Sequence, residues 1–334
     1  MEKSSTERRI GLSVLRIIAC TAVFAVHFGQ RTNLSGTLRK ITDCGSLGVF
    51  LFFVLSGYLA CLSWAKKYDD SRSFGRNVGR YYINRLARLM PLYYFCIVFY
   101  FITETFIWKD VPNDAYGLYW LRYIIPLNGL IPEESYFWSN LGITWTIPVF
   151  LYFYLLFPLI IKVFNTFRRS IILFIITLAI AFAVQKFLGG FLSAFTYFYT
   201  FSLGITAYFA VKEKKQDRFF VLIAIVMLCS LFRFIDKTYG ISAVFALLIV
   251  ALNGLSVKNC IFCKTISRLD EYSYTVYLVH GIVFCGLIDK LDMNRYLTAV
   301  IAVVGTVILS LIVHNAYEKP VALLISRLTK KKNN

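Results

Sequence analysis

The chain has 334 residues, of which 58% are hydrophobic and only 16% are charged, and its mean hydropathy is +0.64. Soluble domains carry about 25% charged residues, so this composition excludes a water-soluble globule. The net charge of +18 does not indicate a nucleic-acid partner, because the basic residues flank apolar segments as they do in cytoplasmic loops of membrane proteins. We expect membrane lipid to solvate most of the chain.

Ten segments are apolar over about the 20 residues that a bilayer span needs. They are 10–29, 44–64, 90–108, 143–161, 170–188, 191–211, 219–235, 239–257, 272–288 and 296–317. We therefore predict an all-α, polytopic membrane protein with a single domain over residues 1–334 and a basic tail at 318–334. With the N-terminus in the cytoplasm, most of the 36 Lys and Arg residues fall in inner segments, which predicts that both termini are cytoplasmic.

An eleventh segment, 115–131, is a weaker candidate because Arg122, Pro126 and Asn128 interrupt it. If it also spanned the bilayer, most of the later basic residues would move to the outer side, against the positive-inside rule. We interpret it as an interfacial or re-entrant piece of an outer loop.

Eight cysteines are scattered along the chain, and Cys260 and Cys263 form a lone CxxC. No second cysteine pair and no histidine lies near it, so packing is favoured over a metal or redox site. No metal site is expected.

Arg16 and His27 are ionisable residues inside the first predicted span, where such groups are candidates for function. Eleven residues separate them, which on an α-helix puts them on nearly the same face and about 16 Å apart along the axis. Arg16 is then nearer the cytoplasm and His27 nearer the outer end.

Lys186 and Arg233 lie two residues from the outer ends of their spans and can reach the headgroups, which leaves three further ionisable residues within spans. His280 is near the middle of the ninth span, one helical turn from Tyr277, and could be structural or a second catalytic group. Glu104 and His314 lie close to the ends of their spans, so we interpret both as interfacial residues within reach of headgroup water.

The segment between the second and third spans is strongly basic, and Arg85 and Arg88 stand just ahead of Pro91. On a helical turn, residues at i and i+3 can meet one anionic group. A phosphate ligand would account for this pair, and the positive-inside bias alone is the alternative.

Taken together, these residues resemble the integral-membrane acyltransferase 3 family over nearly the whole chain. The first span has the family's Arg and His at the positions of Arg16 and His27. The other similar motifs are GVFLFFVLSGYLA from Gly48 to Ala60, Arg85 and Arg88 before Pro91, Trp145 with Tyr154 and Pro158, SYTVYLVH from Ser273, and YEKP from Tyr317.

Two positions depart from the family pattern. The family often has Asp where this chain has Phe50, and Glu where it has Phe150. Branches without these acids resemble fucose- and glucan-modifying proteins, some of which have been viewed as exporters. A borrowed role for a carboxylate in orienting His27 is therefore lost, and a Tyr or a backbone carbonyl is the expected partner of the ring.

The resemblance implies a multi-pass enzyme of the bacterial inner membrane that moves an acyl group, usually acetyl, from cytoplasmic acyl-CoA to a hydroxyl of a cell-surface carbohydrate. It implies a general base at His27, charge stabilisation at Arg16 and a possible catalytic role for His280. Donor contacts are expected at Arg80, Arg85, Arg88 and Tyr277, and acceptor contacts at Ser56, Trp145 and Tyr154. Acetyl-CoA is expected as a donor substrate, with no bound cofactor.

The main alternative is a transporter of a glycan or of its lipid-linked precursor, because intramembrane Arg and His residues suit a transport pathway as well as a catalyst. A membrane receptor or scaffold has no further motif in its favour.

Overall fold

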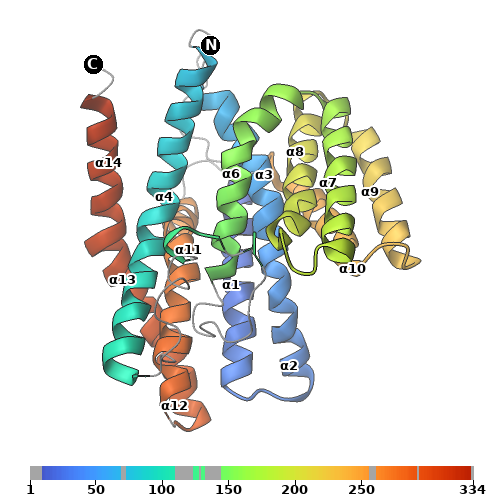
Figure 1. The fold of residues 1–334 in the computed structure, drawn as a ribbon. Helices are drawn as coiled ribbons and strands as arrows, with labels where there is room; N and C mark the ends of the chain where they lie inside the picture. The colour runs from blue at the N-terminus through green and yellow to red at the C-terminus, as the bar shows by residue number, and fades with distance from the viewer. Residues whose placement is uncertain are drawn as a thin grey trace.

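The computed structural model describes residues 10–68, 73–109, 123–127, 129–131, 144–255, 261–291 and 293–331. The elements of these ranges are helices that run mostly alongside one another (Figure 1). Their bounds are α1 Ile10–Arg31, α2 Gly36–Asp43, α3 Gly48–Lys67, α4 Phe74–Ile102, α6 Thr146–Val163, α7 Phe167–Phe187, α8 Phe198–Lys212, α9 Gln216–Leu231, α10 Lys237–Leu252, α11 Ile261–Gly286, α12 Arg295–Val300, α13 Thr306–Val313 and α14 Lys319–Lys331.

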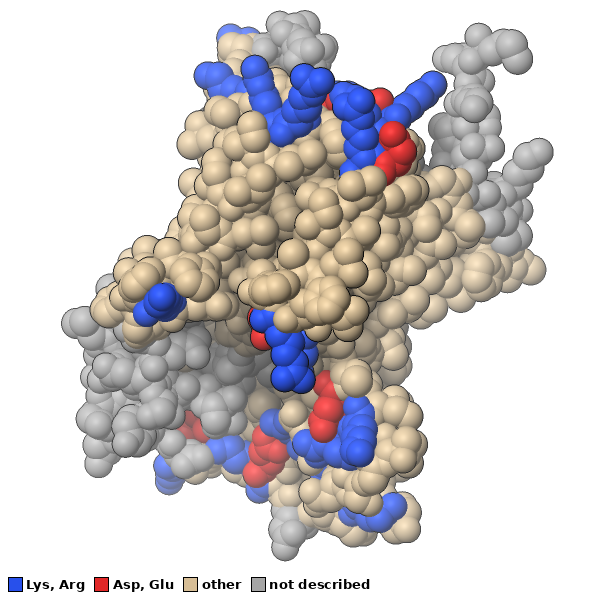
Figure 2. Space-filling view, turned by 90° about the vertical axis from the view of Figure 1, so that its right-hand side faces the viewer, with Lys and Arg blue, Asp and Glu red and all other residues tan. Residues whose placement is uncertain are grey.

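The all-helical, polytopic fold class is confirmed. Within the described ranges, 8 helical stretches are long and apolar enough to cross a bilayer. Each of the ten predicted segments overlaps a helical stretch of the described ranges, but α9 and α10 have only 16 residues each and fall short of this length. Figure 2 shows Lys and Arg side chains at the top of the molecule and through its lower half, with an uncharged band between the two groups. The segment 115–131 lies mostly outside the described residues.

The third helix differs from the sequence expectation. It was predicted over 90–108, whereas α4 begins at Phe74 and continues through Pro91. Arg85 and Arg88 are therefore on the helix itself and not in a loop before it. The basic stretch contains few helix-breaking residues. Hydropathy marks only the apolar part of a helix, so it did not show that this helix begins within the basic stretch.

Two helix pairs position the site. α1 and α11 run parallel, since Arg16 pairs with Asp270 in the first half of each helix, and Arg31 at the end of α1 pairs with Asp289 just beyond the end of α11. α3 crosses α8 so closely that a Cβ on Gly57 would lie 2.1 Å from the carbonyl oxygen of Phe201. Small residues permit such approach between membrane helices.

The bundle has two ends, which lie at opposite ends of α1. We call the end at which α3 finishes and α4 begins the cavity end, and the end at which α1 finishes and α12 begins the histidine end. In Figure 1, α1, α4 and α11 extend at the histidine end beyond the level reached by the connection from α9 to α10.

Candidate active site

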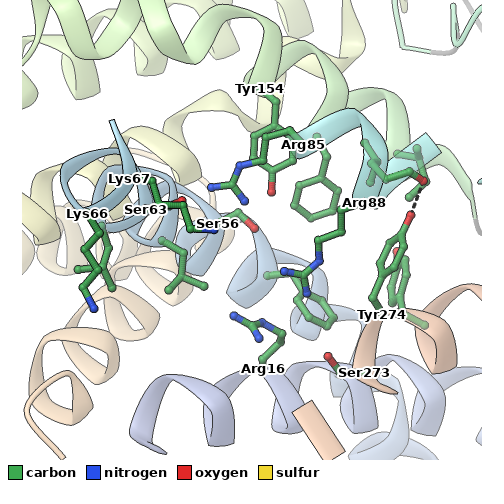
Figure 3. A pocket seen from close by; sticks show the side chains of 17 residues that line it. Arg16, Ser56, Ser63, Lys66, Lys67, Arg85, Arg88, Tyr154, Ser273 and Tyr274 are labelled. Atoms are coloured by element: carbon green, nitrogen blue, oxygen red, sulfur yellow. Dashed lines mark hydrogen bonds between the residues drawn. The ribbon is translucent and has the colours of Figure 1, made fainter. Parts of the chain in front are cut away.

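A cavity of about 350 Å³ opens between α1, α3, α4, α6 and α11 near the cavity end. Its polar lining is basic and hydroxylated: Arg16, Ser56, Ser63, Lys66, Lys67, Arg85, Arg88, Tyr154, Ser273, Tyr274 and Tyr277. No Asp or Glu of the described chain is among the lining residues. Figure 3 shows Arg16, Arg88 and Arg85 directed into the same space. The structure thus brings together cations from three different helices.

Arg16 is the one cavity arginine with a carboxylate partner in the described chain. Its guanidinium pairs with Asp270, which also accepts a hydrogen bond of 2.8 Å from Ser13 Oγ. Asp270 itself does not line the cavity. The carboxylate therefore fixes the direction of Arg16, and the cavity itself stays positive.

Arg85 is held by aromatic rings. Its guanidinium carbon lies 4.9 Å from the ring centre of Tyr154 and 5.4 Å from that of Tyr81, distances at which cations are attracted to aromatic faces. Its Nη2 atom is buried and has no hydrogen-bond partner in the described part of the chain. A buried, unsatisfied donor of this kind favours a bound acceptor such as a phosphate oxygen.

Phe150 also lines the cavity, with its ring 6.2 Å from that of Tyr154. The family often has Glu at this position, and an acid here would partly neutralise the arginines. Phe50 lies elsewhere, 6.1 Å from the ring of Tyr197. Phe50 and Phe150, the two positions that depart from the family pattern, therefore have different surroundings.

Tyr277 forms the wall of the cavity toward the histidine end. Its hydroxyl hydrogen-bonds Thr146 Oγ1 at 2.7 Å, and its ring is 5.5 Å from Phe52 and 5.8 Å from His280. Phe52 lines the cavity as well, whereas His280 does not. Tyr277 thus stands between the cations and a second group of ionisable residues.

His27 and His280 form that second group. Their ring centres are 5.3 Å apart, although 253 residues separate them in sequence. His280 is only 1% exposed, while His27 is half-buried. The two histidines singled out in the sequence are therefore neighbours, which their spacing could not show.

The expected partner of His27, a Tyr or a carbonyl, is not the one found. His27 Nδ1 lies 3.5 Å from Nη1 of Arg31, and Arg31 in turn donates two hydrogen bonds to Asp289, of 3.1 and 2.8 Å. Neither Arg31 nor Asp289 was singled out in the sequence. Their position at the ends of the first and ninth spans was the available signal, but it resembles ordinary interfacial charge.

Two interfacial interpretations are wrong. Glu104 is 5% exposed and pairs with Lys290 at 3.2 Å. His314 is also 5% exposed and hydrogen-bonds Glu318 at 2.9 Å and Thr275 at 3.2 Å. Both lie near span ends in sequence, but packing against α11 or the segment that follows it removes them from water.

Some of the other predicted site residues line the cavity and others do not. Ser56, Tyr154 and Tyr277 line the cavity together with Arg85 and Arg88. Arg80 and Trp145 do not line it, and Trp145 packs against Phe53 and Tyr197 at 6.2 and 5.0 Å between ring centres. The sequence assigned Ser56 and Tyr154 to the acceptor, but both line the same cavity as the cations assigned to the donor. Cys260 lies outside the described residues.

Comparison with known proteins decides the family. The sequence model of the Acyltransferase domain of the acyltransferase 3 family matches residues 9–315. The chain belongs to the acyltransferase 3 family. This match covers both the cationic cavity and the histidine pair.

Two characterised relatives are similar over less than half of the chain. Acyltransferase MdmB of Streptomyces mycarofaciens is 29% identical over 157 residues, which are 44% of this chain and 38% of that protein. Peptidoglycan O-acetyltransferase OatA of Listeria monocytogenes is 29% identical over 160 residues, which are 45% of this chain and 24% of that protein. No solved structure is significantly similar to the chain.

Proposed function

We propose that this acyltransferase 3 protein transfers an acyl group, acetyl in the simplest case, from acyl-CoA to a hydroxyl of a cell-surface or exported polysaccharide or glycolipid. The observation that carries the proposal is the cavity with Arg16, Arg85 and Arg88 and no lining carboxylate, next to a histidine pair. The relative named as a peptidoglycan O-acetyltransferase supports a carbohydrate acceptor.

The cavity suits the donor. Arg85 and Arg88, helped by Lys66 and Lys67 at the rim, would bind the phosphates of CoA, since guanidinium groups bind phosphate through paired hydrogen bonds. Arg16 would stabilise the developing negative charge deeper in the site, where the dielectric is low. Acetyl-CoA is a substrate in this proposal, and no bound cofactor is required.

The histidine pair suits the acceptor. His27 is the half-buried ring near the end of α1, so it would meet a hydroxyl that arrives from the histidine end. An imidazole of the pair would take the hydroxyl proton, as neutral histidine can near pH 7. The sequence assigns this role of general base to His27.

The orientation follows from the same assignment. With both termini cytoplasmic in a bacterial inner membrane, the cavity end would face the CoA pool and the histidine end the cell surface. Labelling of single cysteines placed between residues 73 and 80 should then require permeable reagents in intact cells. Labelling by impermeant reagents would invert the orientation.

The test of the activity uses purified protein in vesicles with radiolabelled acetyl-CoA and an oligosaccharide acceptor. We expect release of CoA and labelled acceptor from the wild type, and a loss of roughly 10²- to 10⁴-fold in the double variant His27→Ala with His280→Ala, as removal of a general base causes. Glycan movement without acetyl-CoA consumption would instead identify a transporter.

A further inference from the structure

The hydrogen bonds around the histidine pair determine which ring nitrogen of each residue carries the proton. Nη1 of Arg31 lies 3.5 Å from His27 Nδ1. A guanidinium has donors only and keeps its proton, so the partner nitrogen must offer its lone pair. The neutral ring of His27 then carries its proton on Nε2.

Arg31 is not free to turn away from His27. Its Nε and Nη2 atoms are both bound to the carboxylate of Asp289, at 3.1 and 2.8 Å, and this two-point contact fixes the plane of the guanidinium. Nη1 is left for His27, and it also donates to Oε1 of Gln30 at 3.3 Å. Gln30 is the competing acceptor for a proton on His27 Nδ1.

His280 has the opposite arrangement. Its Nδ1 lies 3.1 Å from the carbonyl oxygen of Val276, which can only accept, so Nδ1 carries the proton. Its Nε2 is then unprotonated. That nitrogen is buried and has no hydrogen-bond partner in the described part of the chain.

We infer that Asp289 and Arg31 are positioning residues that hold His27 in the tautomer opposite to that of His280, so that Nε2 of His280 receives the proton of the acceptor hydroxyl and His27 serves as an N–H donor. The inference rests on the proposed acyl transfer for its reaction step. The tautomers themselves are independent of turnover.

The assignment follows from what each ring faces once it is protonated. A proton on His280 Nε2 leaves the bond from Nδ1 to Val276 intact, and the carbonyl stabilises the cation. A second proton on His27 would point Nδ1–H at the Arg31 guanidinium, which places two like charges in contact. His280 is therefore the better base of the pair.

The position of His280 also suits the proton balance. In the transfer, the hydroxyl oxygen forms a bond to the thioester carbonyl carbon and the bond from that carbon to sulfur breaks. The hydroxyl proton passes to His280 Nε2 and then to the departing thiolate, which yields an ester and free CoA. His280 lies between His27 and Tyr277, that is, between the acceptor side and the wall of the donor cavity.

The tautomers can be read directly, because the chain has only three histidines. Nitrogen-15 NMR of protein labelled only at histidine in lipid nanodiscs resolves protonated from unprotonated ring nitrogens, and His27→Gln and His280→Gln assign the signals. We expect an unprotonated Nδ1 on His27 and a protonated Nδ1 on His280. A protonated Nδ1 on His27, directed at Gln30, would overturn the inference.

Variants of the neighbours sharpen this measurement. The double variant Arg31→Met with Asp289→Asn removes the guanidinium without leaving an unpaired carboxylate, and should mix the two tautomers of His27 while His280 keeps its own. Gln30→Ala is the matched control and should leave both rings unchanged. An unchanged His27 signal in the double variant would show that Arg31 does not set the tautomer.

Activity separates the roles of the two rings. Glutamine offers an amide N–H but no base, so His27→Gln should keep activity within about tenfold of the wild type, the worth of one hydrogen bond. His280→Gln should lose roughly 10²- to 10⁴-fold. The reverse order would return the base to His27. If the wild type itself transfers no acyl group, the proposed function fails while the tautomer measurement still stands.

Discussion

The cavity end and the histidine end of the bundle both contain several cations, but these cations differ in their partners. At the cavity end, Arg85 and Arg88 share a space with no lining carboxylate in the described chain. At the histidine end, Arg31 pairs with Asp289 and Lys290 with Glu104. A cation that folding leaves unpaired inside a membrane protein is costly unless a ligand binds it.

Whether a cation has a carboxylate partner separates cations that bind a ligand from cations that support the structure. The paired cations at the histidine end are satisfied before any substrate arrives, so their removal should affect the fold or the orientation of His27. The unpaired arginines repel one another, so their removal should affect donor binding and not the fold. The following variants test this separation.

The largest effect on stability is expected at the histidine end. Glu104→Gln should destabilise the protein by about 3 kcal/mol, the low end for a buried ion pair, because it leaves the half-buried Lys290 without this carboxylate. Thermal unfolding in detergent, followed by loss of monodisperse protein on size exclusion, measures it. The double variant Glu104→Gln with Lys290→Gln should recover much of the loss, and a double variant as unstable as the single one would contradict a role for the ion pair.

The next effect is on the donor. Arg85→Gln with Arg88→Gln should weaken acyl-CoA binding by at least tenfold, because each charge-assisted hydrogen bond contributes about 1.5–3 kcal/mol. Thermal stability without ligand should be unchanged or higher, since like charges are removed. Arg88→Lys should weaken binding less, as it keeps the charge but loses the paired geometry. Unchanged affinity in the double variant would place the phosphate site elsewhere.

A smaller effect is expected from the ring that supports Arg85. Tyr154→Leu removes the aromatic face 4.9 Å from the guanidinium and should cost about 0.5–2 kcal/mol of donor binding. Tyr154→Phe keeps the face and is the matched control. Isothermal titration with acetyl-CoA compares the two, and equal losses would point to the hydroxyl instead of the ring.

The smallest effect concerns the start of α10, away from both sites. Asp236 caps this helix, and hydrogen bonds from the Thr238 hydroxyl and backbone N–H lower the pKa of its carboxyl. The resulting stability is present above the ordinary pKa of about 3.9 and is lost as the pH falls through the lowered value. Asp236→Ala should cost about 1 kcal/mol at pH 7.

The pH dependence provides the control for this cap. The difference in melting temperature between wild type and Asp236→Ala should shrink below pH 4. Asp236→Asn also caps helices but does not titrate, so its difference from Asp236→Ala should stay constant. A wild-type advantage that does not shrink at all as the pH falls below 4 would show that the ionised carboxylate is not responsible.

The sequence by itself determined the helical fold class, the ten apolar segments and the placement of Arg16 and His27 on one helix. These features are local, because every backbone polar group within lipid must be satisfied inside its own helix and helical spacing then sets which residues share a face. The i, i+3 spacing of Arg85 and Arg88 could be recognised in the sequence for the same reason.

Only the tertiary structure decided which of these groups meet. The neighbours of Arg16 and His27 come from α11 and the short 3₁₀ helix that follows it, more than 250 residues away: Asp270, His280 and Asp289. Lipid tails are as apolar as the helix surfaces, so hydrophobicity does not select helix partners; close packing at small residues and hydrogen bonds between helices do. The sequence lists the charged groups, but the parallel packing of α1 against α11 determines which are paired and which remain open to a ligand.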